Sequence, residues 1–128
     1  MILIDTHIWI WWVSATGRLR RQHTEILESE SDRLGLSIIS CWEVAKLVQY
    51  GRLDLDRPVS DWINAALSRR NLELLPLTPA IIVESTALPE PFQRDPADQL
   101  IVATARVHGI SLMTEDLKIL GYPHVQPA

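Results

Sequence analysis

The chain begins with Met1-Ile-Leu-Ile-Asp-Thr-His-Ile-Trp-Ile-Trp-Trp-Val13, in which a short apolar run is followed at once by an acid and then by a second apolar run. The run Ile2–Ile4 is short and rich in β-branched residues, which favours a buried strand. We expect the chain to continue as a helix from Thr6 to about Val13. The segment therefore predicts a strand that ends at Asp5 and turns directly into a helix, as in α/β domains.

The same opening segment is apolar enough to suggest a signal sequence. However, Asp5 and His7 interrupt it, no basic residue precedes it, and no small-residue cleavage site follows. It is also too short to span a bilayer. The single cysteine, Cys41, cannot form an intrachain disulfide, which favours a reducing compartment. We therefore expect a cytoplasmic protein that has no membrane partner.

Short apolar runs alternate with longer helical patterns along all 128 residues, which predicts one α/β domain over residues 1–128 with a mostly parallel sheet. The expected strands are Ile2–Ile4, Leu36–Ile39, Leu72–Leu75 and Ile110–Met113, and Val125 is a candidate for a short final strand. The expected helices are Thr6–Val13, Leu19–Ser29, Cys41–Tyr50, Val59–Leu67, Pro79–Ala87, Pro96–His108 and a helical turn over Glu115–Leu120.

The acids fall at the ends of the predicted strands. Asp5, Glu43 and Asp116 each follow a strand, and Asp98 lies in the first turn of the helix that begins at Pro96. Ligands of open parallel sheets bind outside the carboxyl ends of the strands. These four side chains should therefore converge.

Helix capping offers a simpler explanation for each acid taken singly. Ser40 and Glu43 match a capping box, and Asp95-Pro96-Ala97-Asp98 matches an N-cap with proline at the first helical position. Taken together, however, four acids at one edge of a sheet would repel one another without a cation. Helix dipoles offset only about 0.3–1 kcal/mol per charge.

Carboxylate oxygens favour a hard divalent cation such as Mg²⁺. A pair of such ions about 3.5–4 Å apart suits phosphodiester hydrolysis, because it stabilises both the attacking and the leaving oxygen. The sequence has no compact His/Cys cluster for zinc, no GxxxxGK[ST] motif and no GxSxG motif. The site therefore predicts metal-assisted hydrolysis.

The overall charge limits how the chain could bind a nucleic acid. Sixteen acids stand against 12 bases, for a net charge of −4, which argues against a broad basic binding surface. If four of the 16 acids bind a metal, 12 acids remain against 12 bases, and the rest of the surface has no net charge. Local arginines could then attract a phosphate backbone, although solvated side chains are the simpler explanation for any one of them: Arg18, Arg20, Arg21, Arg69, Arg70 and Arg94.

At these acidic residues the sequence resembles PIN-domain nucleases, specifically the VapC-type toxins of bacterial toxin–antitoxin pairs. The matching stretches follow the order of the family from one end of the chain to the other: Leu3–Val13, Ser37–Leu47, Asp95–Ala105 and Leu112–Asp116. The resemblance implies a three-layer α/β PIN domain with Mg²⁺-dependent endoribonuclease activity, Mn²⁺ being an alternative ion. It also implies an RNA substrate, a homodimer and a cognate antitoxin that blocks the acidic site.

The resemblance also implies roles for individual residues. Asp5 and Asp98 would be the principal metal ligands, with Glu43 and Asp116 completing the site. Thr114 would hydrogen-bond to an acid or position the attacking water. Asp95 and Thr6 either serve the site or only cap helices.

The sequence departs from the family at positions that would contact RNA. Related sequences often carry His-Arg before the Asp-Pro pair and Arg after the second Asp, where this chain has Gln93-Arg94 and Gln99. His7 could contact substrate, but a structural or solvent-facing role explains it more simply. The other histidines, His23, His108 and His124, show no pattern.

Other functions remain as alternatives. An RNA-processing nuclease of the same fold, or a catalytically silent PIN scaffold that binds a protein partner, would carry similar residues. A phosphoacceptor receiver domain would need a lysine and a paired-acid motif that we do not find. A phosphatase with Asp-x-Asp after its first strand is disfavoured because position 7 is histidine.

The tryptophans predict where the chain packs. We expect Trp9, Trp12 and Trp42 to lie in the core. Trp11 and Trp62 are candidates for a protein interface, because aromatic residues are enriched there, although packing against a helix face is the simpler expectation.

Overall fold

The structure, a computed structural model, describes residues 1–29 and 31–128. Its sheet has four strands in the order β3-β2-β1-β4, and every neighbouring pair is parallel. The strands are β1 (Ile2–Ile4), β2 (Leu34–Ser37), β3 (Leu72–Leu75) and β4 (Ser111–Met113). β1 is central, with Ile2 paired to Leu34 on one side and to Ser111 on the other.

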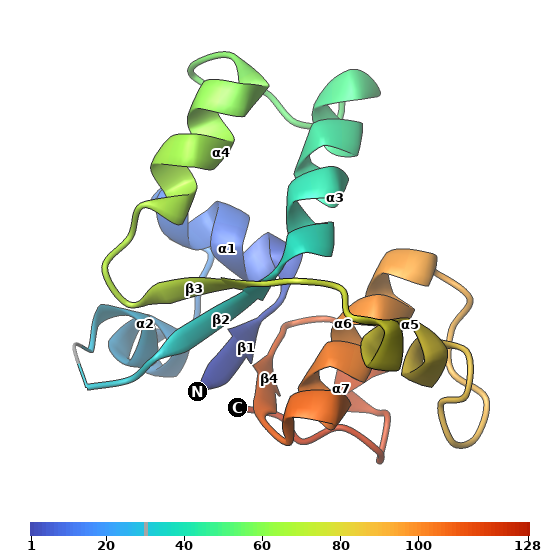
Figure 1. Ribbon diagram of the computed structural model, residues 1–128. Helices are drawn as coiled ribbons and strands as arrows, with labels where there is room; N and C mark the ends of the chain where they lie inside the picture. Colours follow the sequence, from blue (N-terminus) through green and yellow to red (C-terminus); the bar gives the residue numbers. More distant parts are fainter. Residues whose placement is uncertain (30) are drawn as a thin grey trace.

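Helices cover both faces of this sheet, as Figure 1 shows. Among the described residues they are α1 (Thr6–Val13), α2 (Arg21–Glu28), α3 (Ile38–Gln49), α4 (Val59–Leu67), α5 (Pro79–Ser85), α6 (Pro96–His108) and α7 (Leu117–Leu120). The helices α1, α3 and α4 lie on one face, and α6 and α7 lie on the other. The expected three-layer α/β fold with a parallel sheet is confirmed.

Two apolar clusters hold the layers together. One joins the sheet to α1, α3 and α4, where Trp9 and Trp62 meet edge to face with ring centroids 5.0 Å apart. The other joins Leu3 and Leu112 of the sheet to Ile101 of α6. Each fully buried aliphatic or aromatic side chain contributes about 1.5–3 kcal/mol, so these clusters fix the strand ends in place.

The boundary between β2 and α3 differs from the prediction. The strand is Leu34–Ser37 rather than Leu36–Ile39, and Ser37 caps the helix by accepting a hydrogen bond from the backbone N–H of Ile39 at 3.2 Å. The predicted Ser40–Glu43 capping box is therefore wrong. The close approach of β3 contributes to this register, since a Cβ on Gly35 would lie 3.0 Å from Leu75 Cδ1.

Other boundaries shift by a few residues. α2 is Arg21–Glu28 rather than Leu19–Ser29, and α5 ends at Ser85 rather than Ala87. In place of a final strand at Val125, an isolated parallel bridge joins Leu112 to Pro127.

The tryptophan expectations hold in part. Trp9 and Trp12 are buried as predicted, but Trp42 is 51% exposed, so its assignment to the core is wrong. Trp62 is only 5% exposed and packs against a helix, so it is not an interface residue on this chain's surface. None of the helices in the described residues has the length and apolar character needed to cross a membrane.

Candidate active site

Asp5 lies at the carboxyl end of the central strand, where it also caps α1. Its Oδ1 accepts a hydrogen bond from the backbone N–H of Thr6 at 2.8 Å, and its Oδ2 accepts one from Thr114 Oγ1 at 2.7 Å. The residue is only 3% exposed. Burial raises the pKa of this carboxyl, although nearby His7 and the two hydrogen bonds act in the opposite direction. A buried acid of this kind gains from a cation.

Glu43 projects from α3 toward the same strand end. Thr6 Oγ1 donates to Glu43 Oε1 at 2.5 Å and lies 2.8 Å from Ser40 Oγ. Because the single Thr6 hydroxyl proton goes to Glu43, Ser40 must donate to Thr6. Burial, with the charges of Asp5 and Asp95, raises the Glu43 pKa to about 7 against the opposing Thr6 hydrogen bond.

Asp98 approaches from the start of α6. Its Oδ2 accepts from Gln93 Nε2 at 2.7 Å, and its backbone N–H donates to Asp95 Oδ1 at 3.1 Å. Asp95 is thus the N-cap of α6, with Pro96 at the first helical position. Burial raises the Asp98 pKa to about 7, followed by repulsion from Asp5, Asp95, Glu43 and Asp116.

These three acids form a candidate metal centre. One carboxylate oxygen from each of Asp5, Glu43 and Asp98 lies within 4.8 Å of the others. Their raised pKa values have burial as the first cause, and the charges of the other acids add to it. An all-carboxylate donor set that repels itself fits a hard divalent cation such as Mg²⁺.

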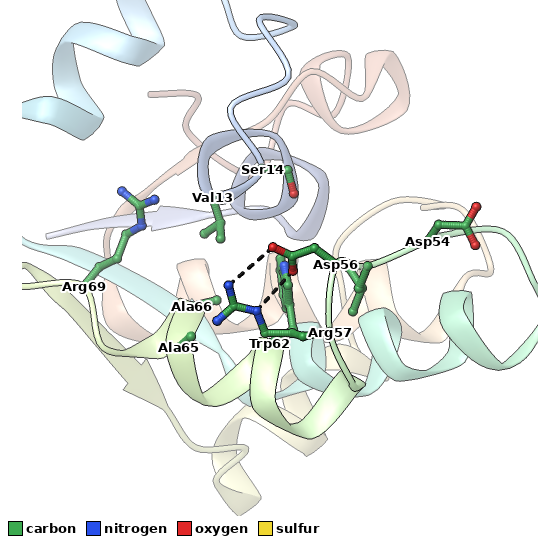
Figure 2. Close-up of a pocket in the computed structure, with 10 residues that line it drawn as sticks. Val13, Ser14, Asp54, Asp56, Arg57, Trp62, Ala65, Ala66 and Arg69 are labelled. Atoms are coloured by element: carbon green, nitrogen blue, oxygen red, sulfur yellow. Dashed lines mark hydrogen bonds and ion pairs between the residues drawn. The ribbon is translucent and has the colours of Figure 1, made fainter.

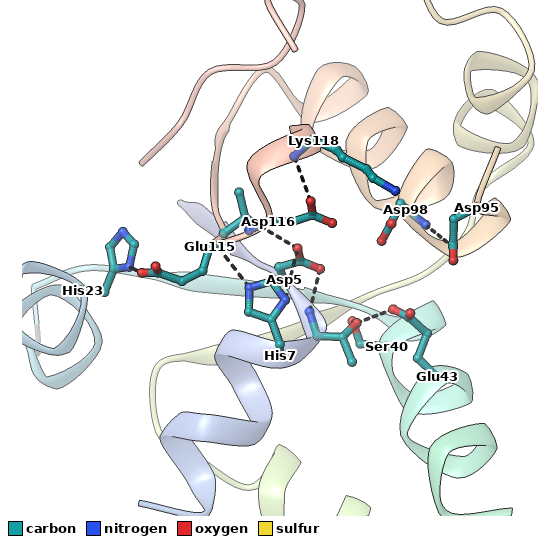
Figure 3. A network of polar contacts seen from close by, with 12 residues as sticks. Asp5, His7, His23, Ser40, Glu43, Asp95, Asp98, Glu115, Asp116 and Lys118 are labelled. Carbon is teal, nitrogen blue, oxygen red and sulfur yellow. Dashed lines mark hydrogen bonds and ion pairs between the residues drawn. The ribbon is translucent and has the colours of Figure 1, made fainter. Parts of the chain in front are cut away.

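Asp116 stands at the rim of this cluster. It caps α7 by accepting from the backbone N–H of Lys118 at 2.9 Å, and its own N–H donates to Thr114 Oγ1 at 3.0 Å. Its oxygens are not among those gathered within 4.8 Å, although its charge raises the pKa values of Asp5 and Asp98. Thr114 therefore connects the rim acid to the central one, and Figure 3 shows the acids arranged around Asp5.

A second polar group, which the sequence did not predict, anchors the loop between β4 and α7. The backbone N–H of Glu115 donates to His7 Nε2 at 3.0 Å, and the Glu115 carboxylate lies 3.0 Å from His23 Nδ1 and 3.3 Å from Arg20 Nε. His23 is 3% exposed (Figure 3). The sequence feature that could have revealed the burial of His23 is its position four residues before Leu27, because this spacing places both side chains on the buried face of α2.

This anchoring fixes the tautomer of His7. Because Nε2 accepts a hydrogen bond, the proton of the neutral ring sits on Nδ1. Nδ1 lies 3.6 Å from Asp5 Oδ2. The loop that carries Thr114 and Asp116 is thus held to α1 and to the start of α2.

A separate cavity of about 460 Å³ lies beyond the far end of α1, as Figure 2 shows. Val13, Trp62 and Arg69 line it, together with the ion-paired Asp56 and Arg57. The carboxylates that line it are Asp54 and Asp56, not those of the acidic cluster. The acidic cluster is therefore not part of this cavity.

Comparison with known proteins agrees with this geometry. The PIN domain family model matches residues 2–124. Ribonuclease VapC22 of Mycobacterium tuberculosis is 33% identical over 126 residues, which cover 98% of this chain and 95% of that protein.

Solved structures show the same fold. A toxin–antitoxin complex from Klebsiella pneumoniae matches with a TM-score of 0.68 at 25% identity, over 98% of this chain and 95% of that chain. VapBC2 from Rickettsia felis, bound to a promoter DNA fragment, matches with a TM-score of 0.72 at 16% identity, over 100% of this chain and 98% of that chain. With its acids at the carboxyl ends of a parallel sheet, the chain belongs to the PIN-domain family, among its VapC-type nucleases.

Proposed function

We propose that the protein is a Mg²⁺-dependent endoribonuclease that hydrolyses RNA phosphodiester bonds, with Mn²⁺ as an alternative ion. The observation that carries the proposal is the gathering of one oxygen each from Asp5, Glu43 and Asp98 within 4.8 Å. The resemblance to a ribonuclease over nearly the whole chain supports the choice of RNA.

Each acid has a role that follows from its contacts. Asp5 and Asp98 would hold the ion, since Thr114 orients the first and Gln93 the second. Glu43 would complete the ligand set, and the Ser40–Thr6 hydroxyl pair fixes its carboxylate. When bound, Mg²⁺ would neutralise charge on the phosphate and activate water. Asp116 would act from the rim.

The contacts of Glu43 leave one oxygen open. The Thr6 hydroxyl hydrogen bond occupies Oε1, so the second carboxylate oxygen is the one that would face the ion.

We further propose that this nuclease is the toxin of a toxin–antitoxin pair and acts in the cytoplasm. The toxin–antitoxin complex at 25% identity supports an antitoxin partner. A homodimer is supported by exposed apolar side chains on α3, on the edge strand β3 and on α5: Ile38, Leu74, Ile82 and Val83. Exposed apolar side chains contribute to protein interfaces where they adjoin one another.

The test is to sequence the RNA ends that the purified protein produces in Mg²⁺. Cleavage at defined positions is expected, and an Asp5→Asn control should produce none. Lack of cleavage of cellular RNA by the parent protein would favour a catalytically silent scaffold. Discrete maturation products would instead favour an RNA-processing nuclease without a toxin role.

A further inference from the structure

A groove beside the acidic cluster contains features that the proposed hydrolysis does not use. It lies between α3 and the start of α6 and has a volume of about 190 Å³. Its walls include Trp42, Lys46 and Tyr50 from α3 and its end, and Asp95 and Pro96 from the α6 side. Pockets for drug-sized ligands measure roughly 300–1,000 Å³, so this groove suits a single planar ring system.

The two aromatic rings in this groove are exposed, which is unusual for such large side chains. Trp42 is 51% exposed and Tyr50 is 67% exposed. With Lys46 they are spaced four residues apart, so they share one face of α3. The Lys46 ammonium lies 5.8 Å from the Trp42 ring centroid and 5.5 Å from that of Tyr50. The face therefore presents a row of ring, cation and ring.

The groove continues into the candidate active site. Glu43 lines it and is also one of the three acids that gather their oxygens. Asp95, on the opposite wall, caps the helix that carries Asp98. A phosphate held at the acidic cluster would therefore place the adjoining nucleotide at the mouth of this groove.

We propose that this groove binds one unstacked base of single-stranded RNA next to the cleaved phosphodiester. Exposed aromatic rings with a neighbouring cation are the usual platform for such bases, because every base presents a flat π-face. Lys46 and Arg52 provide positive charge beside an otherwise acidic site. A duplex does not fit this role, since its bases stay within the stack. This inference rests on the proposed ribonuclease activity.

The experiment measures cleavage of a 12-nucleotide single-stranded RNA that spans a mapped cleavage position, with one abasic residue moved along it. The parent protein should show a KM about tenfold higher at one abasic position only. Trp42→Ala should raise KM by a similar factor with the intact RNA, and abasic substitution at that position should then have no further effect. Such non-additivity shows that the ring and the base interact.

Two variants serve as controls. Trp42→Phe keeps a flat ring and should retain most of the affinity. Val107→Ala removes an exposed side chain near the other end of α6, 43% exposed, and should behave as the parent does. Melting temperatures should be similar for all variants, since Trp42 is half exposed.

The outcomes separate this proposal from the one it rests on. If the parent does not cleave RNA at all, the ribonuclease proposal fails and the base site fails with it. If the parent cleaves but every abasic position behaves alike, only the base site is overturned. If Trp42→Ala leaves KM unchanged and alters the oligomeric mass in light scattering, the groove is a protein contact instead.

Discussion

Replacing Asp98 by asparagine should stabilise the metal-free protein at alkaline pH. The Asp98 pKa is about 7, against an ordinary value of 3.8, so its ionisation is costlier in the folded chain than in the unfolded one. The stability linked to this group is therefore fully present below pH 3.8 and is lost as the pH rises through about 7. Asparagine removes the charge and keeps an oxygen that can accept from Gln93 Nε2.

The expected gain is about 1–2 kcal/mol at pH 8. Converted at about 1.4 kcal/mol per pH unit, the difference between the folded and the ordinary pKa of Asp98 would give a larger gain than this. However, Asp98 remains partly exposed, and water screens its repulsion from the other acids. For a domain of this length the gain corresponds to a melting temperature roughly 3–8 °C higher.

The assay is thermal unfolding in EDTA at pH 5, 6, 7 and 8, followed by circular dichroism. The advantage of Asp98→Asn over the parent should grow across this range. Asp95→Asn is the matched control, because asparagine caps helices about as well as aspartate. Saturating Mg²⁺ should favour the parent, since a ligand stabilises the state that binds it. If the melting temperature of Asp98→Asn at pH 8 in EDTA equals or falls below that of the parent, the conclusion that ionised Asp98 destabilises the metal-free protein is refuted.

Four further predictions follow from the site. EDTA should abolish RNA cleavage and added Mg²⁺ or Mn²⁺ should restore it; full activity in chelator would exclude the metal mechanism. Asp95→Ser should keep its cap and most activity, whereas Asp98→Ser should lose Mg²⁺ affinity in titrations of the cleavage rate; the reverse result would show that Asp95 is the ligand. Apparent Mg²⁺ affinity should rise from pH 6 to 8, because Glu43 and Asp98, each with a pKa of about 7, must lose their protons to bind; affinity independent of pH would contradict this ligand set. Ser37→Ala should lower the free energy of unfolding by about 1 kcal/mol in urea titrations, and an equal loss from Ser40→Ala would contradict the assignment of the cap to Ser37.

Local sequence signals were sufficient for several elements. The bounds of β1, α1, α4, β3 and α6 match the prediction residue for residue. Pro96 and Gly109 mark the two ends of α6, and Gly109 adopts the left-handed conformation with φ of 64° that a C-cap requires. Such signals act within one turn of helix, so they can be read from the sequence.

The start of α3 depends on contacts with other strands. The run Leu36-Ser37-Ile38-Ile39 is compatible with a strand or a helix, and both Ser37 and Ser40 are good caps. Pairing of Leu34 with Leu72, and the close approach of Gly35 to Leu75, set the strand two residues earlier. A local pattern does not contain this information.

The same distinction applies to the candidate site. The acids could be predicted because parallel strands place their carboxyl ends together. The rim position of Asp116 and the anchoring of Glu115 by His23 could not, because they depend on how α2 packs against the loop after β4. The exposure of Trp42 likewise depends on which face of α3 meets the sheet.

The central position of β1 has a consequence for how the protein is made. Asp5 receives its hydrogen bond from Thr114, and its backbone N–H donates to Met113, more than one hundred residues later in the chain. A ribosome synthesises Asp5 more than one hundred residues before it reaches Met113 and Thr114. In the nascent chain Asp5 therefore has only its local hydrogen bond from Thr6, and the contacts that hold it in the acidic cluster form once β4 has emerged and paired with β1.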